Sequence, residues 1–151
     1  VTFYAKNLAV PKRRDVSSKK VLAGKKIFFD AGCGSCHSPK FVTSRNAKNK
    51  AHQFQLIWPY TDLLLHDMGP GLSDNRPFGS ASGSEWRTPP LWGIGLTELV
   101  SGHTSFLHDG RARNLKEAIL WHGGEGARSR DYFKELPLDS RENLIRFLNS
   151  L

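Results

Sequence analysis

The sequence is poor in long apolar runs, in strand-like patterns and in cysteine. No apolar stretch approaches the ~18 residues that a membrane-spanning helix requires, so no membrane span is predicted. No internal repeat, low-complexity tract or convincing strand pattern is present, which favours helices joined by long loops. The chain begins at Val1 without a charged and apolar leader, so we expect either a mature protein or a piece of a longer one.

Positive charge is abundant but is concentrated in one part of the chain. The net charge is +8, and residues 1–50 hold twelve Lys or Arg against two acids, Asp15 and Asp30. The remaining residues hold ten bases and twelve acids. Such a basic region is usually a solvated face, and it also suits a docking surface for an acidic partner. Nucleic acid is not expected as a partner, because no binding motif is present.

A length of 151 residues suits one domain with a single core, residues 1–151. Residues 1–17 are predicted to form an irregular, basic lead-in. Residues 18–31 are predicted to form a helix capped by Ser17 or Ser18. Gly24 on the apolar face of that helix would let the C-terminal helix cross closely. We expect Phe28 and Leu148 to lie near this crossing.

Capping patterns indicate two further helices. Asn114 and Glu117 form a capping box at the start of residues 114–122, and two glycines follow that segment. Residues 139–151 are predicted to form a final amphipathic helix capped by Asp139. Its expected buried stripe consists of Leu144, Ile145, Leu148 and Leu151.

The middle of the chain is predicted to be mostly loop. Residues 38–55 are polar and basic, and residues 72–90 are rich in Gly, Ser and Pro. Between them we expect a short helix after Tyr60 that ends at the Gly-Pro-Gly of residues 69–71. A loop as long as residues 72–90 in a compact domain usually serves a function.

The only two cysteines belong to the stretch Cys33-Gly34-Ser35-Cys36-His37. A zinc site would need a second pair of ligands, and no such pair follows. A thioredoxin-type dithiol would follow a strand, whereas here a predicted helix precedes the motif. A structural disulfide would not require the adjacent histidine. The spacing favours covalent attachment of a c-type haem, with both thiols bonded to one porphyrin edge and His37 as the proximal iron ligand.

A six-coordinate haem iron needs a second axial ligand, usually Met or His. Met68, the only methionine, lies in a Gly/Pro-rich loop, and His122 lies on the apolar face of a capped helix. Helix geometry places His122 slightly ahead of Met68, and Pro39 is expected to orient the His37 ring through a nearby carbonyl. The other histidines are expected at the surface or in hydrogen bonds: His52, His66, His103 and His108.

Several blocks together resemble the C-terminal part of the bacterial dihaem cytochrome c peroxidase superfamily. They are "GKKIFFDAGCGSCHSPKF", "YTDLLLHDMGPGLSD", "RTPPLWGIG", "GHTSFLHDGRARNLKEAILWHGGE" and "LIRFLNSL". The closest branch is that of the dihaem oxidoreductases sometimes labelled thiol oxidoreductases. The "HDG" block is more specific than CxxCH, which occurs in every c-type cytochrome.

The resemblance implies two cytochrome c-like domains, of which the C-terminal one accepts electrons and the N-terminal one reacts with peroxide. Because the chain has one CxxCH, it is similar to the electron-accepting half, as the C-terminal part of a longer dihaem protein. In the superfamily the distal ligand lies fourteen residues after the histidine of "HDG", which corresponds to His108 and His122 here. The resemblance thus favours His122 as ligand, keeps Met68 as fallback, and places His108 near the haem or a domain interface.

The sequence therefore predicts a mainly α, cytochrome c-like domain whose long loops wrap around one covalently bound haem. Its predicted function is one-electron transfer in the periplasm, with an acidic redox protein or a second haem domain as partner. The alternative is the electron-accepting domain of a dihaem peroxidase or oxidoreductase whose catalytic domain is absent from this chain. Arg87 and Arg111 are candidates for neutralising the haem propionates. A haem-free domain with a disulfide is a third hypothesis.

Overall fold

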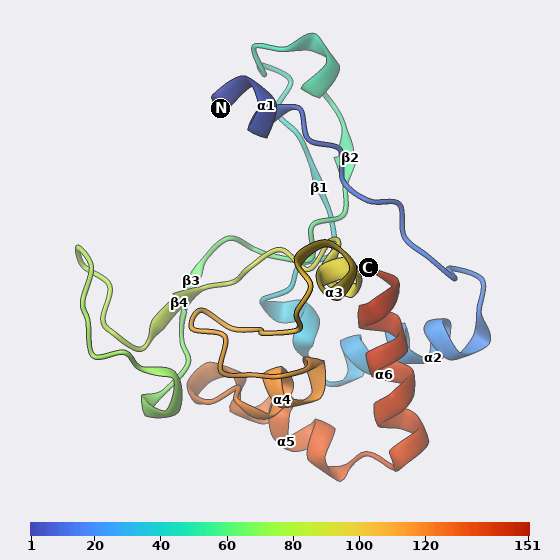
Figure 1. The fold of residues 1–151 in the computed structure, drawn as a ribbon, viewed down its shortest axis with the longest axis vertical. Helices are drawn as coiled ribbons and strands as arrows, with labels where there is room; N and C mark the ends of the chain where they lie inside the picture. The colour runs from blue at the N-terminus through green and yellow to red at the C-terminus, as the bar shows by residue number, and fades with distance from the viewer.

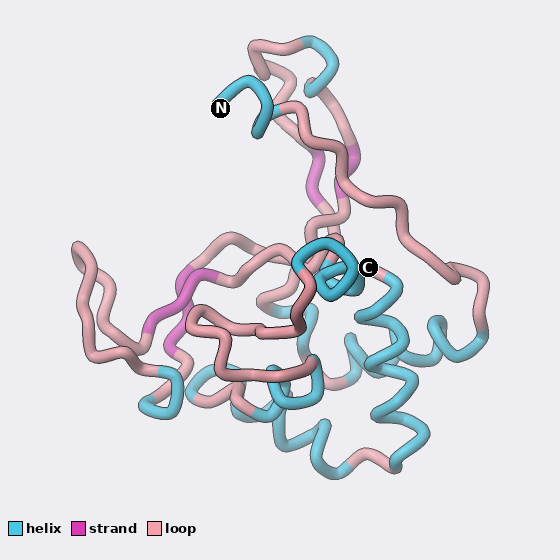
Figure 2. Tube along the Cα trace, viewed as in Figure 1, coloured by secondary structure: helices cyan, strands magenta, loops and turns pink.

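The computed structural model describes residues 1–151, which form six short helices and two small sheets (Figures 1 and 2). The helices are α1 (Thr2–Lys6), α2 (Lys19–Asp30), α3 (Thr97–Ser101), α4 (Leu115–Leu120), α5 (Ala127–Glu135) and α6 (Leu138–Ser150). The strands are β1 (Phe41–Val42), β2 (Leu56–Ile57), β3 (Leu65–Asp67) and β4 (Glu85–Arg87). Short 3-10 helices lie at Cys33–Ser35, Lys50–His52, Pro70–Leu72, Ile94–Leu96 and Gly124–Gly126.

The predicted fold class, a mainly α cytochrome c-like domain, is wrong. Only 43% of the residues are helical, and two antiparallel sheets occupy segments predicted to be loop or helix. Strand β1 pairs with β2, and β3 pairs with β4. The helix expected after Tyr60 is replaced by strand β3, because Tyr60 and Leu63 adopt positive φ values of 54° and 61°, which no right-handed helix permits. The resulting mixture of short helices and small sheets does not define a cytochrome c fold.

The predicted crossing of the N- and C-terminal helices at Gly24 is confirmed. A Cβ at Gly24 would overlap the Asn143 carbonyl of α6 and would lie 2.9 Å from the Cβ of Phe147. Helices α2 and α6 therefore pack backbone against backbone, which only glycine allows at this position. The buried side chains around the crossing form the core: Val21, Phe28, Tyr60, Leu91, Leu115, Phe133, Leu144, Phe147, Leu148 and Leu151.

The helix caps agree only partly with the prediction. Asn114 caps α4, and its side-chain oxygen accepts a hydrogen bond from the backbone N–H of Glu117 at 2.9 Å. Ser18 occupies the cap position of α2, but its side chain makes no capping hydrogen bond. Helix α6 begins at Leu138 after Pro137, so Asp139 lies in the first turn and is not the cap. Proline before the first turn sets the start of α6 because it cannot supply an N–H to a preceding turn.

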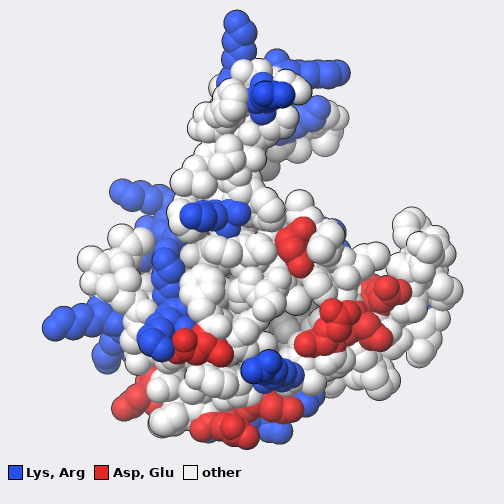
Figure 3. All heavy atoms as spheres, turned by 180° about the vertical axis from the view of Figure 1, so that it is seen from behind, with Lys and Arg blue, Asp and Glu red and all other residues white.

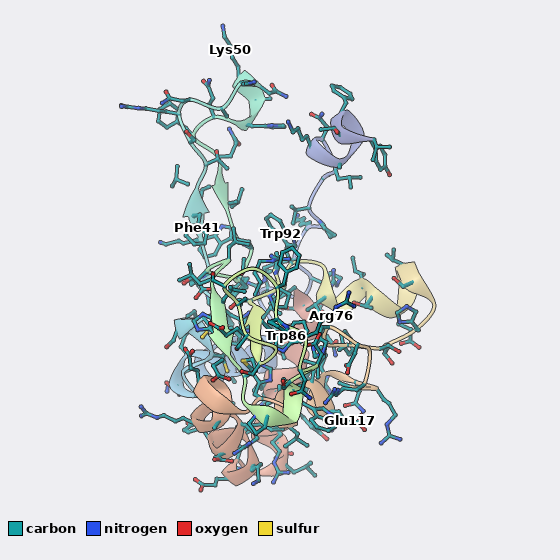
Figure 4. All side chains as sticks on the ribbon, turned by 90° about the vertical axis from the view of Figure 1, so that its left-hand side faces the viewer. Phe41, Lys50, Arg76, Trp86, Trp92 and Glu117 are labelled. Atoms are coloured by element: carbon teal, nitrogen blue, oxygen red, sulfur yellow. The ribbon has the colours of Figure 1, made fainter.

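Two segments project from the same end of the body, which we define as residues 18–40 and 58–151 (Figure 1). One is the arm, residues 41–57, in which β1 and β2 pair and a 3-10 helix forms the far end. Lys50 lies at its tip and Phe41 near its base (Figure 4). The other is the lead-in, residues 1–17, which is not wholly irregular because it contains α1. The arm replaces the loop predicted for residues 38–55.

None of the helices combines the length and the apolar character that crossing a membrane requires.

Candidate functional site

The cysteine motif begins immediately after α2. Gly32 adopts the left-handed conformation with φ 81°, which ends the helix and starts the 3-10 helix Cys33–Ser35. Cys33 and Cys36 are free thiols. Burial raises the pKa of Cys33 to about 11, and burial also raises the pKa of Cys36. Catalytic and disulfide-exchanging cysteines have lowered pKa values, so these thiols do not favour the thioredoxin-type interpretation.

The ring of His37 is held by a backbone carbonyl from a distant loop. Its Nδ1 donates a hydrogen bond to the carbonyl oxygen of Tyr60 at 2.9 Å. The predicted hydrogen bond to a backbone carbonyl is therefore present, and the carbonyl is that of Tyr60. Burial, with a smaller contribution from the nearby His122, lowers the pKa of His37 to about 4. The imidazole is therefore neutral at pH 7. It lies close enough to His122 for a charge on that ring to lower the pKa of His37.

The ring of His122 is held in the same way, by a hydrogen bond to a backbone carbonyl. It directly follows Trp121, the C-cap of α4, and its Nδ1 lies 2.8 Å from the carbonyl oxygen of Ala118. Burial lowers the pKa of His122. A carbonyl oxygen can only accept, so Nδ1 carries the proton in both histidines and Nε2 keeps its lone pair. No hydrogen bond uses the Nε2 atom of His37 or of His122.

Met68 lies beside His122. The position that a Cβ on Gly126 would take is 3.2 Å from both the terminal methyl carbon of Met68 and Cδ2 of His122. Three glycines allow the chain around Met68 to contact the chain after His122. A Cβ on Gly69 would lie 2.9 Å from the Gly124 nitrogen, and one on Gly123 would lie 2.7 Å from the Met68 carbonyl oxygen. The two residues considered for the distal position thus share one side of the site.

A second group of ligand-type side chains lies next to Cys36. Ligand atoms of Cys36, Asp62 and His66 all lie within 4.8 Å of one another. Both nitrogens of His66 already face carboxylates, with Asp62 at 2.8 Å and Glu125 at 2.9 Å. These two hydrogen bonds raise the pKa of His66 and leave it no free lone pair when it is protonated. This cluster was not predicted, because the arm separates Cys36 from its two partners in sequence.

The remaining predicted site residues lie in different surroundings. Arg87 is an exposed residue of β4, and no ion pair involves it. The guanidinium of Arg111 donates to the carbonyl oxygen of Gly71 at 2.5 Å. Its central carbon lies 4.9 Å from the centre of the ring of Trp121, the residue that precedes His122. His108 stacks on Trp86, with ring centres 3.5 Å apart. Arg111 is therefore held beside Trp121, whereas Arg87 is exposed to solvent.

The donor set fits a covalently attached haem. Such a group requires two thiols three residues apart for its thioether bonds and neutral imidazole nitrogens for its iron. Cys33 and Cys36 supply the thiols, and His37 and His122 each keep an unprotonated Nε2. A four-ligand zinc site is a poorer fit, because the cluster beside Cys36 offers three ligand residues and the His66 ring is already bonded to two carboxylates.

Comparison with known proteins gives one positive result. A family model described as "Di-haem oxidoreductase, putative peroxidase" matches residues 1–151. No curated protein and no solved structure matches the sequence significantly. The match covers the whole chain and confirms the relationship that the "HDG" block and the CxxCH motif predicted.

Proposed function

Because the chain belongs to this di-haem oxidoreductase family, we propose that it holds one haem c and serves as an electron-transfer domain. Cys33 and Cys36 would form the two thioether bonds. His37 and His122 would bind the iron through their Nε2 atoms. When bound, the haem supplies a centre that gains and loses one electron.

The observation that carries this proposal is the matching state of the two histidines. Each ring gives its Nδ1 proton to a backbone carbonyl, which fixes its orientation and leaves Nε2 available. Each ring is also held neutral by burial, and a neutral imidazole is the form that binds iron. If both histidines held the iron, the protein would leave no open position for a substrate, which favours electron transfer over bond chemistry.

Replacing the distal histidine tests the proposal directly. We expect His122→Ala to convert a low-spin haem into a high-spin or ligand-exchangeable one, because one axial ligand is lost. His52→Ala, in the arm, is the matched control and should leave the optical spectrum unchanged. A low-spin spectrum with a methionine–iron band in His122→Ala would assign the position to Met68, which lies beside it. An unaltered spectrum in His122→Ala would exclude His122 as ligand.

The family description supports a second candidate, in which this chain is the electron-accepting domain of a di-haem oxidoreductase. The chain has one CxxCH, so a second haem would be held by a different domain. Rapid binding of cyanide to the haem of this chain would favour an enzymatic role here. A haem that is inert to cyanide and peroxide would favour electron transfer alone.

We further propose an acidic protein partner and a periplasmic location. Lys and Arg gather on the arm and along one side of the body, and most acids lie elsewhere (Figure 3). The arm and residues 1–14 contain no acid. Covalent attachment of haem takes place outside the cytoplasm, which supports the location.

The salt dependence of association tests the arm as the docking surface. Association with an acidic single-haem cytochrome should weaken with salt, because exposed charges are screened within about 8–10 Å at physiological ionic strength. The triple variant Arg45→Gln/Lys48→Gln/Lys50→Gln should slow association roughly tenfold. The control Lys19→Gln/Lys20→Gln, on α2, should have a smaller effect. Equal effects of the two variants would exclude the arm as the specific docking surface.

A further inference from the structure

We propose that Tyr60 is the positioning residue for His37: its side chain is an anchor in the core that holds its own carbonyl oxygen against the histidine ring. This inference rests on the proposed function, because it assigns a role toward the haem iron. It concerns a residue that no sequence motif identifies, since Tyr60 lies 23 residues after His37.

Three hydrogen bonds join residues 60–62 to residues 36–38, at the end of the cysteine motif. The Tyr60 carbonyl accepts from His37 Nδ1 at 2.9 Å. The next two residues donate in the opposite sense, from the loop to the motif: the Thr61 N–H to the Ser38 carbonyl at 2.9 Å, and the Asp62 N–H to the Cys36 carbonyl at 2.8 Å. Residues 60–62 therefore run along residues 36–38 and fix both the backbone and the ring of His37.

The backbone of Tyr60 is strained where it supplies this carbonyl. Its φ is 54°, a left-handed value that side chains larger than glycine or asparagine rarely adopt. Such a conformation persists only when the surrounding structure over-determines it. The loop is held from outside as well, because the Leu91 N–H donates to the Pro59 carbonyl at 2.8 Å and the Thr61 hydroxyl donates to the Thr88 carbonyl at 2.7 Å.

The side chain of Tyr60 supplies most of this constraint. It is 0% exposed, and its ring packs edge-on against Phe28 and Phe147, with both ring centres 5.8 Å away. The Tyr60 hydroxyl is buried without a hydrogen-bond partner. An unpaired buried hydroxyl is unfavourable, so the packed ring, and not the hydroxyl, holds Tyr60 in place. The Phe28 ring also lies near His37, with the ring centres 6.3 Å apart.

This arrangement has a chemical consequence for His37. A carbonyl that accepts the Nδ1 proton makes Nε2 a stronger donor to a metal and fixes the plane of the ring. A stronger imidazole donor stabilises iron(III) relative to iron(II). Loosening Tyr60 would therefore shift the equilibrium toward the reduced form and raise the reduction potential.

Three variants of the haem-loaded protein test the role of Tyr60. Tyr60→Leu keeps apolar bulk but loses the edge-on ring contacts, and we expect about a tenfold shift toward the reduced form, which corresponds to about 59 mV for one electron. Tyr60→Phe keeps the ring, so the potential should be retained. Phe133→Leu is the matched control, because Phe133 is buried in the same core at 2% exposure but makes no ring contact with Tyr60. It should lower thermal stability and leave the potential unchanged.

Two outcomes would overturn the inference: an unchanged potential in Tyr60→Leu, or an equal shift in Phe133→Leu. If Tyr60→Leu does not fold, Thr61→Val provides the second test. That variant removes the hydrogen bond to the Thr88 carbonyl, so it should raise the potential by a smaller amount, and an unchanged value would contradict the role of the loop. Failure of the proposed function is distinguishable, because the unsubstituted protein would then carry no haem mass.

Discussion

The aromatic side chains at the helix crossing of the body and those of the arm are buried to opposite extents. In the body, Phe28 and Phe147 are 2% and 0% exposed and lie where α2 crosses α6. In the arm Phe54 is 68% exposed, and in the lead-in Phe3 is 82% exposed. The arm has two strands of two residues each and no helix that covers either face. A two-stranded hairpin of this size is marginally stable by itself.

This contrast separates the residues that stabilise the fold from those that remain available to a partner. Every group of the candidate haem site lies in the body, close to the core crossing or to the segment after α4. The arm combines exposed apolar side chains with bases and no acid, which is typical of an interaction surface. Substitutions in the body should therefore act on stability, and substitutions in the arm should act on association.

The largest effect is expected at the helix crossing. Gly24→Leu should reduce the free energy of unfolding by more than about 3 kcal/mol, because its side chain would overlap the α6 backbone at Asn143. Chemical denaturation measures the change. Gly71→Leu is the matched control, since nothing lies within 4 Å of its Cβ position. Normal stability of Gly24→Leu would mean that the two helices do not cross as described.

A smaller but still large difference is expected between aromatic residues of the two regions. Phe28→Ala should lose about 3–5 kcal/mol, because a buried ring is removed from the core. Phe54→Ala should change stability by less than about 0.5 kcal/mol, because its ring is mostly exposed already. Thermal unfolding of both variants makes the comparison. A similar loss of stability in Phe28→Ala and Phe54→Ala would show that the Phe54 ring is packed in solution. The difference in burial between the body and the arm would then not hold.

The smallest effect compares two asparagine caps. Asn114 accepts from the Glu117 N–H at the start of α4, and Asn49 accepts from the Ala51 N–H in the arm. Asn114→Ala should cost about 1 kcal/mol, as loss of a helix cap does. Asn49→Ala should cost less than about 0.5 kcal/mol, because it caps only a three-residue 3-10 helix in the arm. Equal costs would indicate that the arm folds as one unit with the body.

The parts of the fold that the sequence predicted are those set by local patterns. The Asn114 cap, the apolar stripe of α6 and the glycine face of α2 are each defined by successive residues no more than four positions apart. The sheets could not be predicted in this way, because their strands have two or three residues and pair across long loops. Helix α5 was missed as well, since Phe133 is its only buried residue and gives no periodic signal.

The candidate site likewise has features that a local sequence pattern predicts and features that arise only from contacts between distant segments. The thiols and His37 could be proposed because they form one contiguous motif, and His122 because it directly follows a helix with a recognisable cap, although α4 ends at Leu120, before the predicted end at residue 122. The Tyr60 carbonyl was not predictable, because backbone atoms leave no trace in residue identity and this loop is separated from His37 by the arm. The same holds for the closeness of Met68 and His122, which arises from glycine-mediated contact between two distant segments.

The central claim is that Cys33 and Cys36 tether a haem. Mass spectrometry of the denatured native polypeptide tests it most directly, because thioether bonds survive denaturation. We predict the mass of the 151 residues plus one haem, together with the sharp visible bands of a low-spin c-type cytochrome on reduction. A polypeptide with no added mass would contradict the claim, and with it the proposed electron transfer and the role of Tyr60.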